Sequence, residues 1–470
     1  MLTDHIQTLI RQNLGHAPTP SQEELTEKLA GFILGSNENK VFIVKGFAGT
    51  GKTTLISALV KSLEEIRVKT LLLAPTGRAA KVFSAYAGKT AYTIHRKIYR
   101  QKSSGDGFGE FILNRNLSGN MIILVDEASM ISDTAQEDKI FGSGRLLADL
   151  LSYVGDGHNC RLILIGDTAQ LPPVGIAISP ALNKNELSLY MPVAGEAMLT
   201  DIVRQSKNSG ILENATIVRN LITADRLIPP RLKKKEYHDI SFISGQELTD
   251  FIEKAYEKHG IEEVMILCRS NKRANLYNAG IRKQVLFRDE EITSGDLLLV
   301  VKNNYFWLTG QPEIEFIANG DIVKVIKLRK YTERYGFRFA LAVLQLVDYD
   351  LDFEAWIMLD TLTAESASLG REDSQRLYQS IFEDYQHLDT RKKQYKAVKE
   401  DSLFNALQVK YAYAVTCHKA QGGQWKAVFI DQGYVSDEKT DLEYLRWLYT
   451  AITRATEELY FVNFPERFME

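Results

Sequence analysis

The sequence has few cysteines, no long apolar run and no large excess of one charge. Its three cysteines, Cys160, Cys268 and Cys417, lie far apart in the chain. This spacing excludes a CxxC metal cluster and gives no sign of a disulfide framework, so we expect a reducing, cytoplasmic setting. Because no run of about 18 apolar residues occurs, a transmembrane helix is excluded. The net charge of −3 gives no global sign of a nucleic-acid or membrane partner.

The composition that is present is typical of an ordinary globular protein with ample core. The chain has 470 residues, of which 45% are hydrophobic and 25% are charged. At roughly 150 residues per domain, this length predicts about three domains. Residues 1–14 mix polar and apolar side chains, which predicts an amphipathic helix and does not fit a signal peptide.

Short apolar runs bounded by turn residues recur along the chain and predict the buried strands of parallel sheets. They lie at 41–44, 70–74, 121–125, 161–165, 264–268, 427–431 and 459–462. Helix-like stretches lie between or beside these runs at 53–65, 146–154, 272–286 and 442–456. The alternation of β and α segments predicts an α/β fold with two such domains, the second one split.

The split in the second domain falls between about 290 and 408. Residues 296–359 contain β-rich runs separated by turn residues, which predict a small antiparallel β domain, and residues 371–399 are charged and helix-like. The predicted domains are therefore 1–198 with a hairpin insertion at about 99–120, 199–290 joined to 409–470, and a β-rich insertion at 291–408.

Residues 46–53, Gly-Phe-Ala-Gly-Thr-Gly-Lys-Thr, match the P-loop pattern G-x-x-x-x-G-K-[ST] between a predicted strand and a predicted helix. The backbone N–H groups of such a loop surround phosphate oxygens, and Lys52 adds a charge for the β and γ phosphates. The hydroxyl of Thr53 is expected to contact Mg²⁺. The predicted nucleotide-binding residues of this segment are Gly46, Ala48, Gly49, Thr50, Gly51, Lys52, Thr53 and Thr54.

An acidic pair, Asp126 and Glu127, directly follows the apolar run 121–125. At the end of a buried strand such a pair can divide its work, Asp126 holding Mg²⁺ through water and Glu127 orienting the attacking water. Beside the P-loop, the pair predicts hydrolysis of Mg-ATP or Mg-GTP. ATP is favoured because the N-K-x-D segment typical of small GTPases is missing. A kinase for a small molecule fits poorly with a second α/β domain.

Six segments, one of which contains the acidic pair, accompany the P-loop along the chain. They are 74–81 (APTGRAAK), 125–130 (VDEASM), 166–174 (GDTAQLPPV), 203–205 (VRQ), 416–422 (TCHKAQG) and 449–454 (YTAITR). Their order is that found in superfamily 1 helicases, and the chain resembles the RecD-like and Dda-like branch of that superfamily. The resemblance implies two RecA-like domains, with a hairpin insertion in the first and a small SH3-like insertion in the second. It also implies an ATP-driven motor on single-stranded DNA that unwinds duplex in the 5′ to 3′ direction.

The same resemblance implies roles for four residues around the nucleotide. Gln22 would read the adenine, and Gln170 would sense the γ-phosphate. Arg204 and Arg454 match two family arginines that reach the γ-phosphate, the second from across the cleft between the α/β domains. A guanidinium stabilises charge on the transferring phosphoryl group, so hydrolysis would require domain closure.

Residues 78–102 combine seven Lys or Arg residues with four aromatic residues and no acidic residue. Cations for phosphates beside flat rings for bases suit single-strand binding, while the alternative is a solvated basic helix face over buried aromatics. The predicted strand contacts are Pro75, Thr76, Lys81, Phe83, His95, Thr416, His418 and Lys419. For His418 and Lys419 the alternative is that they brace the cleft.

Residues 102–111 are rich in turn residues, polar and tipped with aromatic side chains, and they look like the family's hairpin that splits the duplex. Phe108 and Phe111 are the candidate wedge residues, with a purely structural role as the alternative. The expected cofactors are ATP and Mg²⁺, and the expected partners are single-stranded DNA and single-strand/duplex junctions, without a membrane. An RNA-directed or protein-displacing ATPase and a nucleotide-switched binding protein remain alternatives. No signal identifies protein partners or a pathway.

Overall fold

The computed structural model describes residues 2–35, 38, 40–101, 111–135, 141–173, 175–203, 209–234, 237–308, 314, 316–366, 368–435 and 440–470. The first part of the chain forms a six-stranded parallel sheet in the order β3-β2-β6-β7-β1-β8. Its strands are β1 (Val41–Gly46), β2 (Lys69–Ala74), β3 (Ala91–Thr93), β6 (Met121–Val125), β7 (Arg161–Gly166) and β8 (Val193–Leu199). The predicted buried strands of this region are confirmed, and β6 and β7 are buried along their whole length.

Alternate side chains of β1 enter two separate cores, as a strand covered on both faces requires. Phe42 and Val44 join the core on one face, and Val41 and Ile43 join the core on the other. The first face is covered by α1 (Leu2–Leu14), α2 (Pro20–Leu34), α3 (Lys52–Glu65) and α4 (Gly77–Ala87), and the second by α5 (Ile94–Ile98), α6 (Leu146–Asp156) and α7 (Lys184–Ser188). The helix predicted over residues 1–14 is therefore confirmed as α1.

A second parallel sheet has the order β16-β10-β17-β18-β9. Its strands are β9 (Ile240–Ile243), β10 (Val264–Cys268), β16 (Ala414–Thr416), β17 (Trp425–Asp431) and β18 (Ala455–Val462). The helices of this unit are α8 (Gly210–Thr223), α9 (Leu248–His259), α10 (Asn271–Gly280), which continues as a π-helical turn over Ile281–Val285, and α13 (Leu442–Ile452). The helix predicted at 442–456 is too long, because the chain is already extended at Ala455, where β18 pairs with β17.

The β-rich insertion is a closed barrel of five strands, β11-β12-β13-β14-β15. They are β11 (Leu297–Val300), β12 (Ile322–Arg334), β13 (Phe337–Leu346), β14 (Leu351–Met358) and β15 (Leu407–Tyr411), and two helices, α11 (Arg371–Asp384) and α12 (Arg391–Glu400), precede β15. Neighbouring strands are antiparallel except β14 and β15. The predicted β domain is confirmed, but β15 runs across the boundary predicted between 408 and 409.

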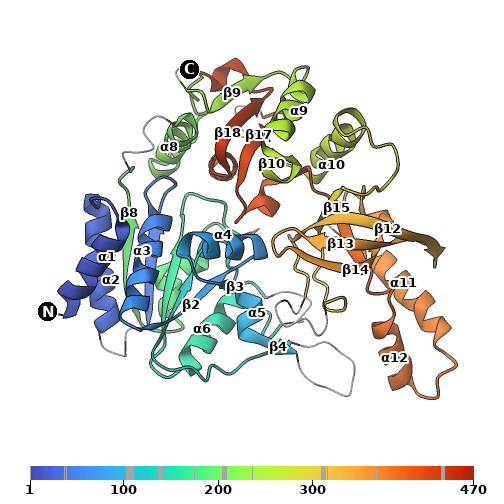
Figure 1. Cartoon of the computed structure of the whole chain (residues 1–470), viewed down its shortest axis with the longest axis horizontal. Coiled ribbons are helices and arrows are strands. Elements are labelled where there is room, and N and C mark those ends of the chain that lie inside the picture. Colours follow the sequence, from blue (N-terminus) through green and yellow to red (C-terminus); the bar gives the residue numbers. More distant parts are fainter. Residues whose placement is uncertain are drawn as a thin grey trace.

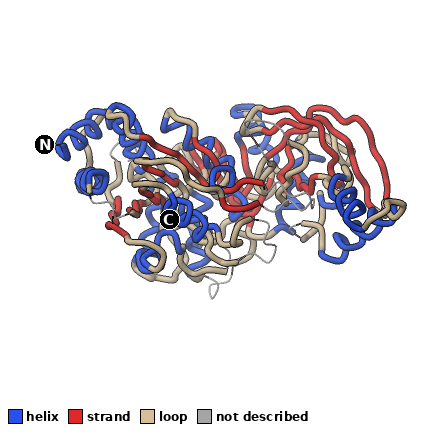
Figure 2. The backbone as a smooth tube through the Cα atoms, turned by 90° about the horizontal axis from the view of Figure 1, so that it is seen from below, coloured by secondary structure: helices blue, strands red, loops and turns tan. Residues whose placement is uncertain are grey.

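The barrel lies at the end of the molecule opposite the N-terminal helices (Figures 1 and 2). On the side that faces the barrel, α4 packs on the first sheet and contacts the barrel through Lys81 (Figure 1). The predicted hairpin is present as the antiparallel pair β4 (Tyr99–Gln101) and β5 (Phe111–Leu113). The tip of this hairpin, with Phe108, lies outside the described residues. Of the helices in the described ranges, none is long and apolar enough to span a membrane.

A buried carboxylate, that of Asp296, joins the barrel to the second α/β unit. It has no exposed surface. Its Oδ1 accepts hydrogen bonds from Arg288 Nη1 at 2.7 Å and Tyr413 Oη at 2.8 Å, and its Oδ2 accepts from Arg282 Nη2 at 3.0 Å and the Thr293 N–H at 2.8 Å. Burial alone would raise the pKa of Asp296, but these hydrogen bonds hold it below its usual value.

We expect Asp296→Ala to lower the free energy of unfolding by about 3–5 kcal/mol, because the buried guanidinium of Arg282 and the partly buried one of Arg288 lose their counter-charge. Urea unfolding followed by circular dichroism measures this. Asp352→Ala, at an exposed position of β14, is the control and should change stability by less than about 0.5 kcal/mol. Equal stability of the two variants would contradict a structural role for Asp296.

Candidate nucleotide site and nucleic-acid surface

The P-loop leaves the carboxyl end of β1 and enters α3, as the sequence predicts. Gly49 and Gly51 have φ angles of 74° and 77°, in the left-handed region that favours glycine. A Cβ atom on Gly46 would lie 2.8 Å from Cγ of Lys52, so this position also needs glycine. Nζ of Lys52 donates to the carbonyls of Gly46 at 2.6 Å and Phe47 at 3.0 Å. The carbonyl groups of the P-loop thus hold the Lys52 side chain beside the cavity that the loop borders.

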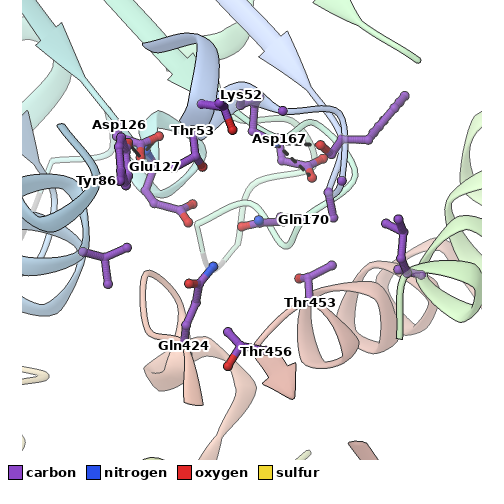
Figure 3. Close-up of a pocket in the computed structure, with 18 of the residues that line it drawn as sticks. Lys52, Thr53, Tyr86, Asp126, Glu127, Asp167, Gln170, Gln424, Thr453 and Thr456 are labelled. Carbon is purple, nitrogen blue, oxygen red and sulfur yellow. Dashed lines mark hydrogen bonds and ion pairs between the residues drawn. The ribbon is translucent and has the colours of Figure 1, made fainter. Parts of the chain in front are cut away.

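A cavity of about 570 Å³ lies between the two α/β units, a volume typical of sites for small molecules. Residues of the first unit line one side, and Gln424, Thr453 and Thr456 of the second unit line the other (Figure 3). Thr53 and Thr54 are exposed to solvent and border this cavity. The predicted phosphate site is therefore an open pocket with walls from both units.

Asp126 and Glu127 lie at the end of β6 and border the cavity. Oδ1 of Asp126 accepts the N–H of Glu127 at 2.8 Å, and Oδ2 accepts the hydroxyl of Tyr86. Glu127 has a φ of 51°, a strained conformation that is uncommon for residues with a side chain. Burial raises the pKa of both carboxyl groups. The Tyr86 hydrogen bond opposes the rise at Asp126, and the charge of Arg454 opposes it at Glu127.

Arg454 reaches the same cavity from the second unit. Its side chain is almost fully buried, and its Nη1 lies 3.8 Å from Oε1 of Glu127. Its guanidinium also donates to the carbonyls of Thr450 at 3.1 Å and Gly423 at 3.2 Å, which fix its direction. Gln170 borders the cavity from the first unit, and its buried Oε1 lacks a hydrogen-bond partner within the part of the chain that the structure describes.

Direct contacts between the units surround these groups, and sequence reasoning missed them. The hydroxyl of Tyr449 donates to Oδ2 of Asp167 at 2.6 Å and accepts the P-loop N–H of Ala48 at 2.8 Å. Nearby, the N–H of Leu171 donates to Oγ1 of Thr450 at 2.9 Å. These residues lie inside the segments 166–174 and 449–454, which the sequence had already identified as functional candidates. No feature of the sequence showed that the two segments touch.

Two predicted nucleotide contacts remain predictions. Gln22 is fully buried, its Oε1 accepts the N–H of Thr19 at 3.0 Å, and its Nε2 donates to the carbonyl of Thr50 at 3.1 Å. In this conformation Gln22 caps α2 and braces the P-loop, and it does not line the cavity. Arg204 lies outside the described residues.

The predicted strand contacts of the first unit gather at the start of α4. Thr76, which follows Pro75, caps this helix by accepting the N–H of Ala79 at 3.2 Å. Lys81 is exposed and donates to the carbonyl of Val347, in the barrel, at 3.2 Å. The hydroxyl group of Thr76 therefore has a local role already, while the ammonium of Lys81 lies where the first unit meets the barrel.

The predicted contacts of the second unit lie on the 3₁₀ turn η7 (Cys417–Ala420) and on the residue before it, Thr416. Burial lowers the pKa of His418 and of Lys419 on this turn. The loop that follows η7 reaches α4, since a Cβ on Gly422 would lie 3.0 Å from Oγ1 of Thr76. The predicted contacts of the two units thus border one interface.

Two predicted strand contacts need correction. Phe83 is fully buried under α4, where its ring stacks on Tyr86 with centroids 5.1 Å apart. Phe111 is 4% exposed and packs on the rings of Phe141 and Tyr305, with centroids 4.9 and 4.7 Å away. Neither ring is free to meet a base. The predicted contact of His95 stays a prediction. Burial lowers the pKa of this partly exposed ring to about 4, so at neutral pH it offers a phosphate an uncharged N–H donor.

The reason is the same for both residues. Aromatic rings bury large apolar areas, and here the faces of α4 and β5 that carry them turn into the cores. The alternative of buried aromatics beneath a basic face therefore holds for Phe83, and a packing role holds for Phe111.

Comparison with known protein families gives two matches. A family model of an AAA domain matches residues 19–224, and a model of a UvrD-like helicase C-terminal domain matches residues 411–462. The two matches cover the segments that line the cavity from either side.

The chain is also similar to curated proteins. It is 25% identical to the ATP-dependent DNA helicase Dda of Enterobacteria phage T4, over 89% of this chain and 93% of that protein. It is 28% identical to the ATP-dependent RecD2 DNA helicase of Deinococcus radiodurans, over 42% of this chain and 24% of that protein. An uncharacterized protein of Acanthamoeba polyphaga mimivirus is 25% identical over 94% of this chain and 99% of that protein.

Among solved structures, a Pif1 helicase from Bacteroides in complex with ADP-AlF3 and single-stranded DNA is similar to the chain. The match has a TM-score of 0.46 and 16% identity, and it covers 97% of this chain and 95% of that one.

The lowered pKa of His95 predicts an acid-dependent loss of stability. Its folded pKa of about 4 lies below the usual value, so the unfolded chain binds the proton first and stability falls as the pH drops from 6.5 toward 4. At pH 5 the loss is up to about 2 kcal/mol. Urea unfolding at pH 7 and pH 5 measures it.

His95→Gln should remove this part of the pH dependence, and His5→Gln, at an exposed position of α1, should leave it unchanged. The same dependence in His95→Gln as in the unchanged protein would show that His95 is not buried in its neutral form.

Proposed function

Because the chain belongs to the superfamily 1 helicases of the RecD and Dda type, we propose that it is an ATP-dependent translocase on single-stranded DNA that unwinds duplex in the 5′ to 3′ direction. The observation that carries this proposal is the cavity between the α/β units. Lys52, Asp126 and Glu127 border it from the first unit and Arg454 from the second. Such a site can hydrolyse ATP only while the units are together, which couples chemistry to domain motion.

The residues present fit Mg²⁺ together with a nucleotide. Mg²⁺ binds through one or two side-chain oxygens, phosphate oxygens and water, and Thr53 and Asp126 both offer oxygen at the cavity. Within the described ranges no group of three or more His, Cys, Asp or Glu residues forms a separate metal site. When bound, the ion neutralises charge that develops on the phosphates.

We assign the remaining work at this site to the protein's own groups. The P-loop N–H groups and Lys52 hold the phosphates, and Glu127 accepts a hydrogen bond from the attacking water and so aims it at the γ-phosphorus. Arg454 stabilises the charge on the transferring group. Gln170, which borders the same cavity, reports whether the γ-phosphate is present, because its amide N–H₂ group can donate to a phosphate oxygen.

The strand track follows from the same arrangement. The start of α4 and the turn η7 border the interface between the units, so a strand bound there contacts both. When the cleft opens and closes, the contacts of one unit with the strand then change relative to the contacts of the other unit. The proposed strand contacts remain Pro75, Thr76, Lys81, His95, Thr416, His418 and Lys419, and the hairpin tip with Phe108 remains the proposed wedge.

The domain division is proposed as predicted, with the last boundary moved beyond β15 because that strand completes the barrel. The three cysteines are buried free thiols, which supports the proposed cytoplasmic setting.

We expect Arg454→Ala to lower DNA-stimulated ATP hydrolysis by at least about 10³-fold, because an arginine that reaches the γ-phosphate contributes that much. Binding of ATP and of single-stranded DNA should persist. Arg446→Ala is the matched control, since Arg446 lies on α13, the helix that Arg454 directly follows, and also bonds across the interface, to the carbonyl of Ala177. A near-normal rate in Arg454→Ala would remove this residue from the mechanism.

Partial duplexes with a 5′ or a 3′ single-stranded tail test the motor itself. With Mg-ATP, the 5′-tailed substrate should open and the 3′-tailed one should not, as strand displacement on native gels measures. Opening of the 3′-tailed substrate alone would contradict the polarity. Hydrolysis without opening of either would contradict unwinding, and stimulation of hydrolysis by RNA in place of DNA would favour an RNA-directed ATPase.

A further inference from the structure

Tyr86 lies near the end of α4 and reaches the wall of the nucleotide cavity. Sequence reasoning counted it among the aromatic residues of the basic region 78–102, as a candidate for stacking on bases. The structure places it elsewhere. Its hydroxyl donates to Oδ2 of Asp126, and the two side chains lie together at one side of the cavity (Figure 3).

This hydrogen bond completes the orientation of the Asp126 carboxylate. The other oxygen, Oδ1, accepts the N–H of Glu127 at 2.8 Å. A carboxylate held through both oxygens by donors on different elements cannot rotate without losing one of them. Since a carboxylate offers about four acceptor positions, these two bonds leave acceptor capacity for water around Mg²⁺.

The tyrosine is itself held from two directions. Its ring stacks on the fully buried ring of Phe83 with an interplanar angle of 28°. Its backbone carbonyl accepts the hydroxyl of Ser57 at 2.7 Å, and Ser57 lies on α3, the helix that begins at the P-loop lysine. The hydroxyl that orients Asp126 is thus fixed relative to the phosphate loop. Residues that do not bind a metal themselves but hydrogen-bond to its ligands tune a metal site in this way.

We propose that Tyr86 is a positioning residue for Mg²⁺, which fixes the direction of Asp126 and so strengthens the binding of magnesium with the nucleotide. The inference rests on the proposed function in one respect, that the cavity takes a Mg²⁺-nucleotide. A purely structural role would instead lower the stability of the fold and affect nucleotide binding with and without metal alike.

Tyr86→Phe tests the proposal, because it removes the hydroxyl and keeps the ring and its stacking on Phe83. Titration with fluorescently labelled ADP, in excess EDTA and in MgCl₂, gives the affinity gain that magnesium brings. We expect the metal-free affinity to stay within about twofold. The magnesium gain should fall about tenfold, the lower end of the loss seen when such partners are removed.

Two further variants complete the test. Tyr153→Phe is the matched control, a buried tyrosine of α6 on the opposite face of the same sheet, and it should keep the full magnesium gain. Asp126→Asn should lose most of the gain. Adding Tyr86→Phe to it should cause no further loss, because the hydroxyl acts through Asp126.

The outcomes separate this inference from the proposed function. If Tyr86→Phe keeps the full magnesium gain, or weakens metal-free binding by the same factor, a positioning role is overturned while the nucleotide site stands. Additive losses in the double variant would also overturn it. Failure of the unchanged protein to bind ADP in either buffer would instead overturn the proposed ATP site.

Discussion

The closed arrangement of the site depends on a buried contact across the cleft, between Tyr449 and the P-loop of the other unit. The hydroxyl of Tyr449 is a hydrogen-bond donor and acceptor at once: it donates to Asp167 and accepts from the N–H of Ala48. In a buried place each unmade hydrogen bond is costly, so separation of the units exposes or orphans three polar groups together. The phosphate loop, the Asp167 carboxylate and α13, the helix that Arg454 directly follows, therefore form one unit of structure only while the cleft is closed.

Most of the fold was predictable, because the strands of a parallel sheet covered on both faces are short apolar runs that local sequence reveals. The runs at 121–125 and 161–165 became β6 and β7, and the P-loop pattern placed β1 and α3 as well. The limits of the prediction come from long-range pairing. Local sequence extends α13 to 456, but pairing with β17 makes Ala455 extended, and closure of the barrel draws residues 407–411 into β15.

The candidate site divides in the same way. Residues whose chemistry is tied to a fixed local pattern, such as Lys52, Asp126 and Glu127, line the cavity as their motifs imply. Aromatic residues were harder, because a ring next to lysines suits both a base and a core. Phe83 and Phe111 both pack in a core, because burial of an aromatic ring stabilises the fold more than its exposure to solvent would. For Tyr86 the hydroxyl group determines where the side chain lies. It has a hydrogen-bond partner in a partly buried carboxylate, and the periodicity of the sequence does not reveal such a partner.

The ion pairs that stabilise the fold are shorter than the ion pairs at the nucleotide site. Around Asp296 the donors lie 2.7 to 3.1 Å away, and every group has its partner. At the nucleotide cavity the cations are held differently: Lys52 lies 3.9 Å from Asp167 and Arg454 lies 3.8 Å from Glu127. These distances balance charge without a full hydrogen bond between the pairs. When Lys52 and Arg454 turn to phosphate oxygens they therefore lose no hydrogen bond to a carboxylate and give up bonds to neutral backbone carbonyls, whereas the arginines around Asp296 cannot leave it without loss of stability.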